Sequence, residues 1–289
     1  MPTIDLPHGK LRYRAAGPED SKRPPVVFIH GFLVSNTLWS KTADALAEAG
    51  IRSYAPDLPL GSHSLPLDDS ADQTPRGVAR RVLAFIEAMG LDDVTIVGND
   101  SGGAISQFLI DTDSSRVGRL VLTNCDAFDE FPPAPFDTIF KSFKKPGPIR
   151  ALMAPMRSTK IRHSPAGYGL LVGKPLDAEQ TRAWAEPCIT DAGVRKDAAK
   201  FVTAVDADEE MNGVSERLSE FDGPLLLVWG NGDRFFKVEL ARRLAATAKD
   251  AKLVEIEGGK TFIPLDEPER LAAEIDGFVP ATVAEKTAG

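Results

Sequence analysis

A short apolar run at residues 94–97 leads directly into a glycine-rich turn, and an amphipathic stretch follows it. The turn reads Gly98-Asn99-Asp100-Ser101-Gly102-Gly103. Where a strand turns sharply into a helix, the tip residue is exposed at the sheet edge, and the residues two positions away must be small. Gly98 and Gly102 meet that requirement around Asp100, whereas a turn centred on Ser101 puts a larger side chain where a glycine is wanted. The sequence therefore predicts a strand–turn–helix unit with a carboxylate at its tip.

The chain on either side of this unit alternates short apolar runs with stretches of helical period. The runs typical of strands lie at 25–29, 51–55, 94–97, 120–122, 224–229 and 253–256, and the helical stretches at 39–46, 78–89, 104–109 and 266–278. This alternation is typical of a mostly parallel sheet with helices on both faces. We therefore predict an α/β fold with a doubly wound sheet.

The alternation stops between residues 126 and 217, a segment that is rich in proline and has no strand-like run. Helical patches occur within it at 176–184 and 198–205. An insertion of this length between two sheet strands indicates a helical lid. The predicted organisation is a core of residues 1–125 and 218–280, a helical lid over 126–217, and a frayed tail at 281–289.

This order of elements resembles the α/β-hydrolase superfamily over residues 10–280, and the resemblance rests on the turn at Asp100 and on Trp-Gly-Asn-Gly-Asp at residues 229–233. The aspartate at the turn makes the chain most similar to the epoxide hydrolase and haloalkane dehalogenase branch. In that branch the aspartate attacks an electrophilic carbon and forms an alkyl-enzyme ester. The resemblance thus implies that Asp100 is the nucleophile. Two alternatives stay open, in which Asp100 caps the following helix or Ser101 is the nucleophile.

The same resemblance implies roles for three other positions. The backbone N–H groups of Phe32 and Ser101 would stabilise an anion or hold the second carboxylate oxygen. Asp233 lies where the superfamily carries its catalytic acid, and it is either that acid or a loop residue. Asp126 lies where some haloalkane dehalogenases place the acid instead, although we expect it to be a surface-loop residue.

The catalytic histidine of the superfamily has no counterpart at its usual place. Between the last strand and the closing helix the chain reads Gly-Gly-Lys-Thr-Phe, so that Thr261, beside Lys260, stands at the histidine position. Threonine cannot exchange a proton near neutral pH, and lysine can only if it is strongly desolvated. A surrogate base could come from His63, on a loop at the same sheet edge, or from His163 in the lid.

The substrate signatures of the branch are incomplete. Its epoxide hydrolases use two lid tyrosines to protonate the epoxide oxygen, whereas this chain has only Tyr168 there. Its haloalkane dehalogenases bind halide through a Trp after the nucleophile and an Asn after His-Gly, positions that hold Ser101 and Phe32 here. The candidate pocket residues are His30, Trp39, Tyr168 and Trp184. For the His30 side chain we favour a buried structural role.

The composition of the chain limits the classes of molecule that it is expected to bind. A net charge of −8 argues against nucleic acid and anionic membranes. The two cysteines have no spacing typical of a disulfide framework or a zinc site, and we expect no metal or cofactor. The absence of a signal-peptide pattern and of a membrane-length apolar run predicts a cytoplasmic protein. We expect it to be a monomer or a homodimer.

Three functions follow. The first is a hydrolase, similar to epoxide hydrolases or dehalogenases, that acts on a small or medium apolar compound through Asp100. The second is a lyase, isomerase or cyclase that uses Asp100 as a base and tolerates the missing histidine. The third is a catalytically inactive protein that binds a ligand in the same pocket.

Overall fold

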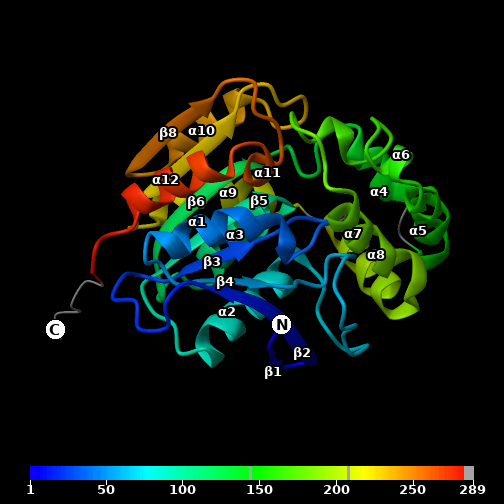
Figure 1. Cartoon of the computed structure of the whole chain (residues 1–289), viewed down its shortest axis with the longest axis horizontal. Helices are drawn as coiled ribbons and strands as arrows, with labels where there is room; N and C mark the ends of the chain where they lie inside the picture. The colour runs from blue at the N-terminus through cyan, green and yellow to red at the C-terminus, as the bar shows by residue number, and fades with distance from the viewer. Residues whose placement is uncertain (143–144, 207–208, 283–289) are drawn as a thin grey trace.

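The computed structural model describes residues 1–142, 145–206 and 209–282. In this part of the chain, eight strands form one sheet in the order β1-β2-β4-β3-β5-β6-β7-β8 (Figure 1). Their bounds are β1 Thr3–Leu6, β2 Gly9–Ala16, β3 Val26–Ile29, β4 Ser53–Pro56, β5 Val94–Asp100, β6 Val117–Cys125, β7 Leu225–Gly230 and β8 Ala251–Ile256. The pairs β1–β2 and β2–β4 are antiparallel, and the pairs from β4 to β8 are parallel. The predicted mostly parallel sheet is confirmed.

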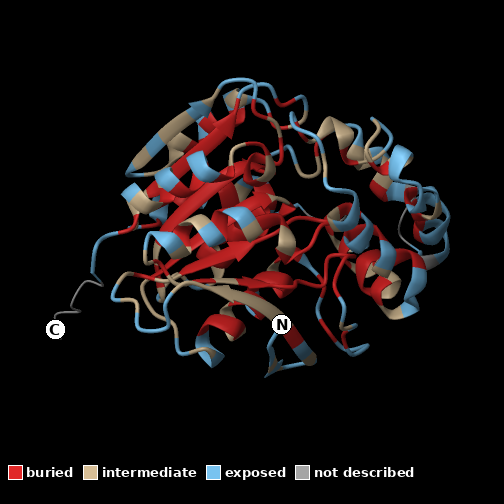
Figure 2. Ribbon diagram, in the orientation of Figure 1, coloured by how far each residue is buried: buried red, intermediate tan, exposed pale blue. Residues whose placement is uncertain are grey.

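Helices cover both faces of the sheet. The helices outside the long insertion are α1 Ser40–Glu48, α2 Pro75–Ala88, α3 Ser101–Thr112, α10 Val238–Thr247, α11 Ile263–Asp266 and α12 Pro268–Phe278. Helix α1 packs against α12, whereas α2 packs against α3. Right-handed crossovers from β3 to β4 and from β4 to β5 run in opposite directions along the sheet, which puts α1 and α2 on opposite faces. Strands β3, β5, β6 and β7 are therefore buried between two layers (Figure 2).

The chain between β6 and β7 forms a helical insertion beside the sheet (Figure 1). Its helices are α4 Phe136–Ser142, α5 Pro146–Met153, α6 Thr159–Arg162, α7 Ala178–Thr190, α8 Ala192–Asp206 and α9 Met211–Glu216, and its described residues include no strand. Helix α9 packs on α3, so the chain has returned to the sheet layers before residue 217. Four 3₁₀ helices complete the described elements: Asn36–Trp39, Ala154–Arg157, Tyr168–Leu170 and Arg217–Glu220.

Hydrogen bonds join the insertion to the core next to the loop that contains Lys260 and Thr261. Asp266, which is buried, accepts hydrogen bonds from the backbone N–H of Gly173 at 2.8 Å and of Lys174 at 3.1 Å. Phe262 N–H donates to the carbonyl oxygen of Leu171 at 2.9 Å. These contacts hold residues 171–174 against the carboxyl end of the sheet.

The N-terminal end of the chain differs from the predicted pattern. The antiparallel hairpin of β1 and β2 is not predicted from the sequence, because neither strand contains a continuous apolar run like those of the central strands. The predicted frayed tail at 281–289 lies outside the described residues from 283 onward. None of the helices within the described ranges has the length and apolar character needed to span a bilayer.

Candidate active site

Asp100 lies at the junction of β5 and α3 with φ 57° and ψ −137°. Such a conformation is uncommon outside glycine and stores on the order of 1–3 kcal/mol of strain. A Cβ atom added at Gly98 would lie 2.7 Å from the carbonyl oxygen of Gly102, and one added at Gly102 would lie 2.7 Å from that of His30. The two glycines therefore permit the sharp turn that the sequence predicts, and the turn holds Asp100 at its tip.

The loop after β3 passes directly over this turn. A Cβ atom added at Gly31 would lie 2.7 Å from both Cβ and Cγ of Asp100, so glycine leaves the space that the carboxylate occupies. The backbone N–H of Ser101 donates to that carboxylate. The other predicted donor, the N–H of Phe32, instead donates to the hydroxyl of Ser101 at 3.1 Å. Of the two predicted donors, the Ser101 N–H therefore faces the Asp100 carboxylate, whereas the Phe32 N–H is directed to the neighbouring hydroxyl.

Asp100 and Ser101 open into a cavity of about 380 Å³, within the range of small-molecule sites. Its lining comes from the sheet edge and from the helical insertion. Aromatic side chains that face the cavity include Phe32, Phe136, Phe140, Tyr168, Phe201 and Phe236. Among the described lining residues, Asp100 and Asp126 are the charged ones. The cavity therefore suits an apolar ligand with one reactive group placed near the two carboxylates.

Asp126 is not the surface-loop residue that the sequence predicts. Asp100 pairs with Cys125 across β5 and β6, which places Asp126 just beyond that pair at the same sheet edge. Its side chain is 2% exposed and lines the cavity. Its Oδ1 atom has no hydrogen-bond partner among the described residues. The expectation fails because the following residues, up to Phe128, remain packed in the core.

Burial shapes the titration of both carboxyl groups. It raises the pKa of Asp100 to about 7, and the charge of Asp233 adds to the rise while the Ser101 N–H opposes it. Burial also raises the pKa of Asp126 well above its ordinary value, and the charge of Asp100 adds to that rise. Two like charges in an apolar cavity cannot both ionise readily. The pair therefore retains one proton near neutral pH.

Asp233 follows β7 and lies below the cavity. Its Oδ2 accepts hydrogen bonds from the Thr261 hydroxyl and from Asn124 Nδ2, both at 2.9 Å. Thr261 is fully buried and is not part of the described cavity lining. Lys260 donates from Nζ to the carbonyl oxygen of Val172 at 2.9 Å. Both residues at the histidine position are therefore engaged in structural hydrogen bonds.

Two asparagines that sequence reasoning missed hold this region together. Asn99 donates from Nδ2 to the carbonyl oxygen of Thr261 at 2.7 Å and to the Thr123 hydroxyl at 2.8 Å. Asn124 accepts from the N–H of Gly230 at 2.7 Å through Oδ1. Both are fully buried at the ends of otherwise apolar strands, and that position is the signal that could have identified them.

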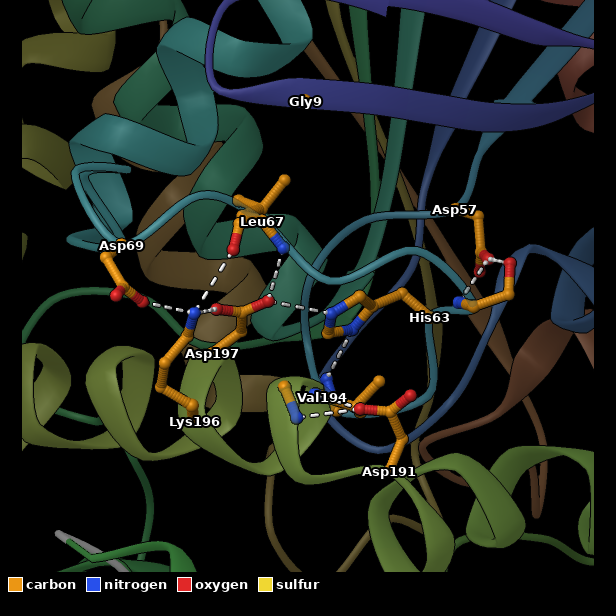
Figure 3. Close-up of polar contacts among 12 residues, drawn as sticks. Gly9, Asp57, His63, Leu67, Asp69, Asp191, Val194, Lys196 and Asp197 are labelled. Atoms are coloured by element: carbon orange, nitrogen blue, oxygen red, sulfur yellow. Dashed lines mark hydrogen bonds and ion pairs between the residues drawn. The ribbon is translucent and has the colours of Figure 1, made fainter.

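His63, predicted as a surrogate base, faces away from the cavity. Its Nε2 lies 3.2 Å from Oδ2 of Asp197 on α8, and its Nδ1 accepts from the N–H of Gly61 (Figure 3). His163 lies 3.0 Å from the Thr181 hydroxyl through its Nε2. No histidine in the described part of the chain lines the cavity. The prediction for His63 is corrected because a buried carboxylate on the helical insertion binds its imidazole.

His30 has the structural role that we favour, and it is not a described lining residue. Its Nε2 accepts from the N–H of Leu58 at 2.9 Å and its Nδ1 lies 2.9 Å from the Gly31 carbonyl oxygen. Burial lowers the pKa of His30 to about 4, which keeps the imidazole neutral. The ring therefore fastens the loop after β3 to the loop after β4.

The aromatic pocket candidates divide into two groups. Tyr168 lines the cavity and donates its hydroxyl to the carbonyl oxygen of Leu33 at 2.7 Å. Trp39 and Trp184 are fully buried and lie outside the described lining. Trp39 stacks on Phe28 with ring centroids 4.7 Å apart, whereas Trp184 packs at the base of the insertion. The pocket prediction for these two tryptophans is corrected, because each fills the core.

Among the residues that the structure describes, no group of three or more His, Cys, Asp or Glu side chains is arranged to hold a metal ion. The described lining of the cavity includes two carboxyl groups and the hydroxyls of Ser101 and Tyr168.

Comparisons with known proteins agree with this architecture. The chain is 27% identical over 235 residues, covering 79% of it and 77% of the relative, to a 2-hydroxy-6-oxononadienedioate/2-hydroxy-6-oxononatrienedioate hydrolase of Klebsiella pneumoniae. It is 27% identical over 288 residues, covering 94% and 92%, to haloalkane dehalogenase 2 of Mycobacterium tuberculosis.

Solved structures share the fold at lower identity. A haloalkane dehalogenase from Bradyrhizobium elkani superposes with a TM-score of 0.78 at 19% identity over 96% of each chain. A putative lipase from Acinetobacter baumannii superposes with a TM-score of 0.76 at 19% identity over 96% of this chain and 89% of that one. Residues 24–268 match the alpha/beta hydrolase fold family, and this chain therefore belongs to it.

Proposed function

We propose that this protein is a hydrolase in which Asp100 attacks an electrophilic carbon of a small or medium apolar compound and forms an ester intermediate. The observation that carries the proposal is the position of the Asp100 carboxylate, which stands at the tip of a strained turn and opens into an apolar cavity. A turn of this kind exposes its tip residue to a ligand while the backbone on both sides stays fixed.

The relatives support a hydrolytic reaction. Those described above are an oxononadienedioate hydrolase and a haloalkane dehalogenase, and the second aligns over 94% of this chain. The carboxylate at the turn favours attack on carbon, since aspartate carboxylates can form covalent ester intermediates with a carbon centre. With its pKa near 7, Asp100 is substantially ionised at neutral pH and so available for attack.

The remaining parts of the site have roles in the same reaction. The helical insertion, residues 126–217, acts as a lid that contributes most of the apolar lining and selects the substrate. When water attacks the ester, the N–H groups of Phe32 and Ser101 stabilise the oxyanion that forms on the Asp100 carboxyl group. Asp233 positions the loop of Thr261 beneath the site. Thr261 replaces the base that the fold usually carries, so the histidine position is degenerate.

A single turnover in water enriched in ¹⁸O tests the proposal. With enzyme in excess over styrene oxide, the first diol formed should contain no ¹⁸O, and the label should enter the Asp100 carboxyl group. This follows because water attacks the ester carbonyl and the product keeps the original oxygen of Asp100. Peptide mass spectrometry locates the label.

Variants provide the controls. Asp100→Asn should abolish both the label and the product, whereas Asp129→Asn, the same change at an exposed position nearby, should leave both unchanged. Label in the first diol, or full activity of Asp100→Asn, would contradict an ester at Asp100. Binding of styrene oxide without adduct or product would indicate an inactive ligand-binding protein instead.

A further inference from the structure

We infer that Asp126 is a second catalytic residue, a carboxyl group that gives a proton to the departing oxygen when Asp100 attacks and takes a proton from water when the ester is hydrolysed. This inference rests on the proposed role of Asp100. It supplies the proton carrier that the chain lacks at Thr261, and it favours epoxides, whose leaving oxygen needs a proton, over halides, which do not.

The first support is the sheet register. Asp100 pairs with Cys125 in the parallel ladder of β5 and β6, and neighbouring strands lie about 4.8 Å apart. Asp126 follows Cys125 directly, and its side chain lines the same cavity as Asp100. A substrate that contacts the Asp100 carboxylate is therefore beside Asp126 as well.

The second support is the unsatisfied carboxyl group. Asp126 is 2% exposed, and its Oδ1 has no hydrogen-bond partner among the described residues. Its backbone is fixed, because its carbonyl oxygen accepts from Gln107 Nε2 at 2.9 Å. Its own backbone N–H is the donor that favours the ionised form, and burial outweighs it, so the group is held as the neutral acid. The ionisable groups that act on it, Asp100 and Glu130, are both acidic and favour the same form.

The third support is that the other candidates are engaged elsewhere. The hydroxyl of Tyr168 donates to the Leu33 carbonyl oxygen, and that of Thr261 donates to Asp233. The imidazole of His63 is bound to Asp197 in the insertion. Asp126 is thus the lining residue that carries an acidic proton and an open path to the ligand.

The first step moves one proton and keeps the charge of the cavity constant. An oxygen of Asp100 forms a bond to an epoxide carbon, the carbon–oxygen bond of the ring breaks, and the proton of Asp126 passes to the departing oxygen. Asp100 becomes a neutral ester while Asp126 becomes the carboxylate. The cavity holds one negative charge before and after the step, which avoids the repulsion of two buried anions.

The second step reverses the roles. The Asp126 carboxylate takes a proton from water as the water oxygen bonds to the carbonyl carbon of the Asp100 ester. The tetrahedral intermediate then expels the alcohol oxygen, to which Asp126 returns the proton. The regenerated Asp100 carboxyl keeps the second proton of the water, and the pair then shares it. Retaining glycosidases use one carboxyl group as acid and then base in the same manner.

The test compares two probes that differ in their need for an acid. Styrene oxide requires protonation of its leaving oxygen, whereas 1-iodohexane releases iodide without it. Rapid quenching and intact-protein mass spectrometry measure how fast each probe adds to Asp100. In Asp126→Asn, addition of styrene oxide should slow about 10²- to 10⁴-fold, the typical contribution of general acid catalysis. Addition of 1-iodohexane should stay within about threefold of wild type, and the resulting ester should persist about 10²-fold longer.

Further variants make the result specific. Asp126→Glu keeps a carboxyl group and should recover part of the styrene oxide rate, while Asp129→Asn should match wild type with both probes. Equal rates for both probes in Asp126→Asn and wild type would overturn the inference and leave Asp100 as the nucleophile. An equal fall in the addition rates of both probes would also overturn it, since Asp126 would then serve only to position Asp100. If wild type forms no adduct with either probe, the proposed nucleophile fails and the role of Asp126 fails with it.

Discussion

The hydroxyl of Thr261 donates a hydrogen bond to Oδ2 of Asp233 at 2.9 Å. Under the proposed function, Thr261 stands where a histidine base is expected, and it makes the contact to Asp233 without being able to exchange a proton near neutral pH. Asn124 and the N–H of Phe235 satisfy the rest of the Asp233 carboxylate. Hydrogen bonds from Thr261, Asn124 and Phe235 therefore satisfy both oxygens of the Asp233 carboxylate.

Restoring an imidazole at this position should speed hydrolysis of the ester. We expect Thr261→His to shorten the lifetime of the 1-iodohexane adduct by at least 10-fold, because a positioned base contributes about 10²–10⁴-fold and the larger side chain must fit a buried site. In the double variant Thr261→His/Asp126→Asn, the rate of ester hydrolysis should fall less than it does in Asp126→Asn alone. Adduct lifetime by mass spectrometry measures both effects.

The control for this change is Thr261→Val, which has nearly the same shape without the hydroxyl. It removes one donor from Asp233 and should lower the free energy of unfolding by about 1–3 kcal/mol. It should not shorten the adduct lifetime. A shortened lifetime in Thr261→Val would show that the gain in Thr261→His comes from looser packing and not from the imidazole.

The pKa of Asp100 predicts how adduct formation depends on pH. Burial and the charge of Asp233 raise this pKa to about 7, so the Asp100 carboxyl is mostly protonated below that pH. The rate of 1-iodohexane addition should rise through pH 7 and level off above it, and at pH 5 it should be about 100-fold below the plateau. Quenched reactions between pH 5 and 9, followed by mass spectrometry, give the dependence of the addition rate on pH.

Styrene oxide should give a different profile, because its addition also needs the proton of Asp126. The pKa of Asp126 lies well above its ordinary value through burial and the charge of Asp100. The rate should therefore rise with Asp100 ionisation and fall again at higher pH, as a bell-shaped curve. A single rising limb for both probes would argue against an acid role for Asp126.

The raised pKa of Asp100 also has a consequence for stability. Below its ordinary value of 3.8 the group is protonated in both the folded and the unfolded chain, and no penalty arises. As the pH rises from about 4 to 7, the unfolded chain ionises first, so the folded state loses stability progressively; above 7 the penalty is constant. Asp100→Asn should thus raise the free energy of unfolding by roughly 2–4 kcal/mol at pH 8.

The gain in Asp100→Asn should shrink towards pH 4, where the wild-type carboxyl is protonated in both states. Urea unfolding at pH 4 and pH 8 measures the difference. Asp129→Asn should show no such gain, since Asp129 is exposed and its pKa is lowered by its own backbone and by Arg243. An equal gain at both pH values would mean that relief of packing, and not of charge, stabilises Asp100→Asn.

The sequence predicts the fold and the turn because both depend on local patterns. Strands β3 and β7 are continuous apolar runs, as expected for strands buried on both faces. The turn at Asp100 depends on glycines two residues away. The hairpin of β1 and β2 escapes prediction, since its strands lie at the edge and are mostly half-exposed.

The site is only partly predictable, because long-range pairing decides which polar side chains face the cavity. The position of Asp126 follows from the register of β5 against β6, which no local pattern encodes. His63 is turned away by Asp197, a residue 134 positions later in the chain. Trp39 and Trp184 are aromatic and belong to segments expected near the site, yet side-chain packing places them in the core.

Gly31 leaves the space that the Asp100 carboxylate occupies, and this leads to the last prediction. A Cβ atom there would overlap Oδ2 of Asp100 and lie 2.7 Å from its Cβ and Cγ, so Gly31→Ala must displace the carboxylate. We expect the rate of 1-iodohexane addition to fall at least 10²-fold, because a displacement of about 1 Å has that effect on an aligned nucleophile. Overpacking should also lower the free energy of unfolding by about 1–3 kcal/mol.

The matched control is Gly277→Ala on α12, where a Cβ atom would meet nothing within 4 Å. It should raise the free energy of unfolding by no more than about 0.5–1 kcal/mol, the gain in a helix interior, because Gly277 lies one residue before the end of α12, and it should leave the addition rate unchanged. Comparing the two addition rates at 25 °C, where both variants are folded, distinguishes the effect of displacing Asp100 from the effect of a change in stability. Wild-type addition in Gly31→Ala would show that the loop after β3 yields, and that the carboxylate does not depend on it for its position.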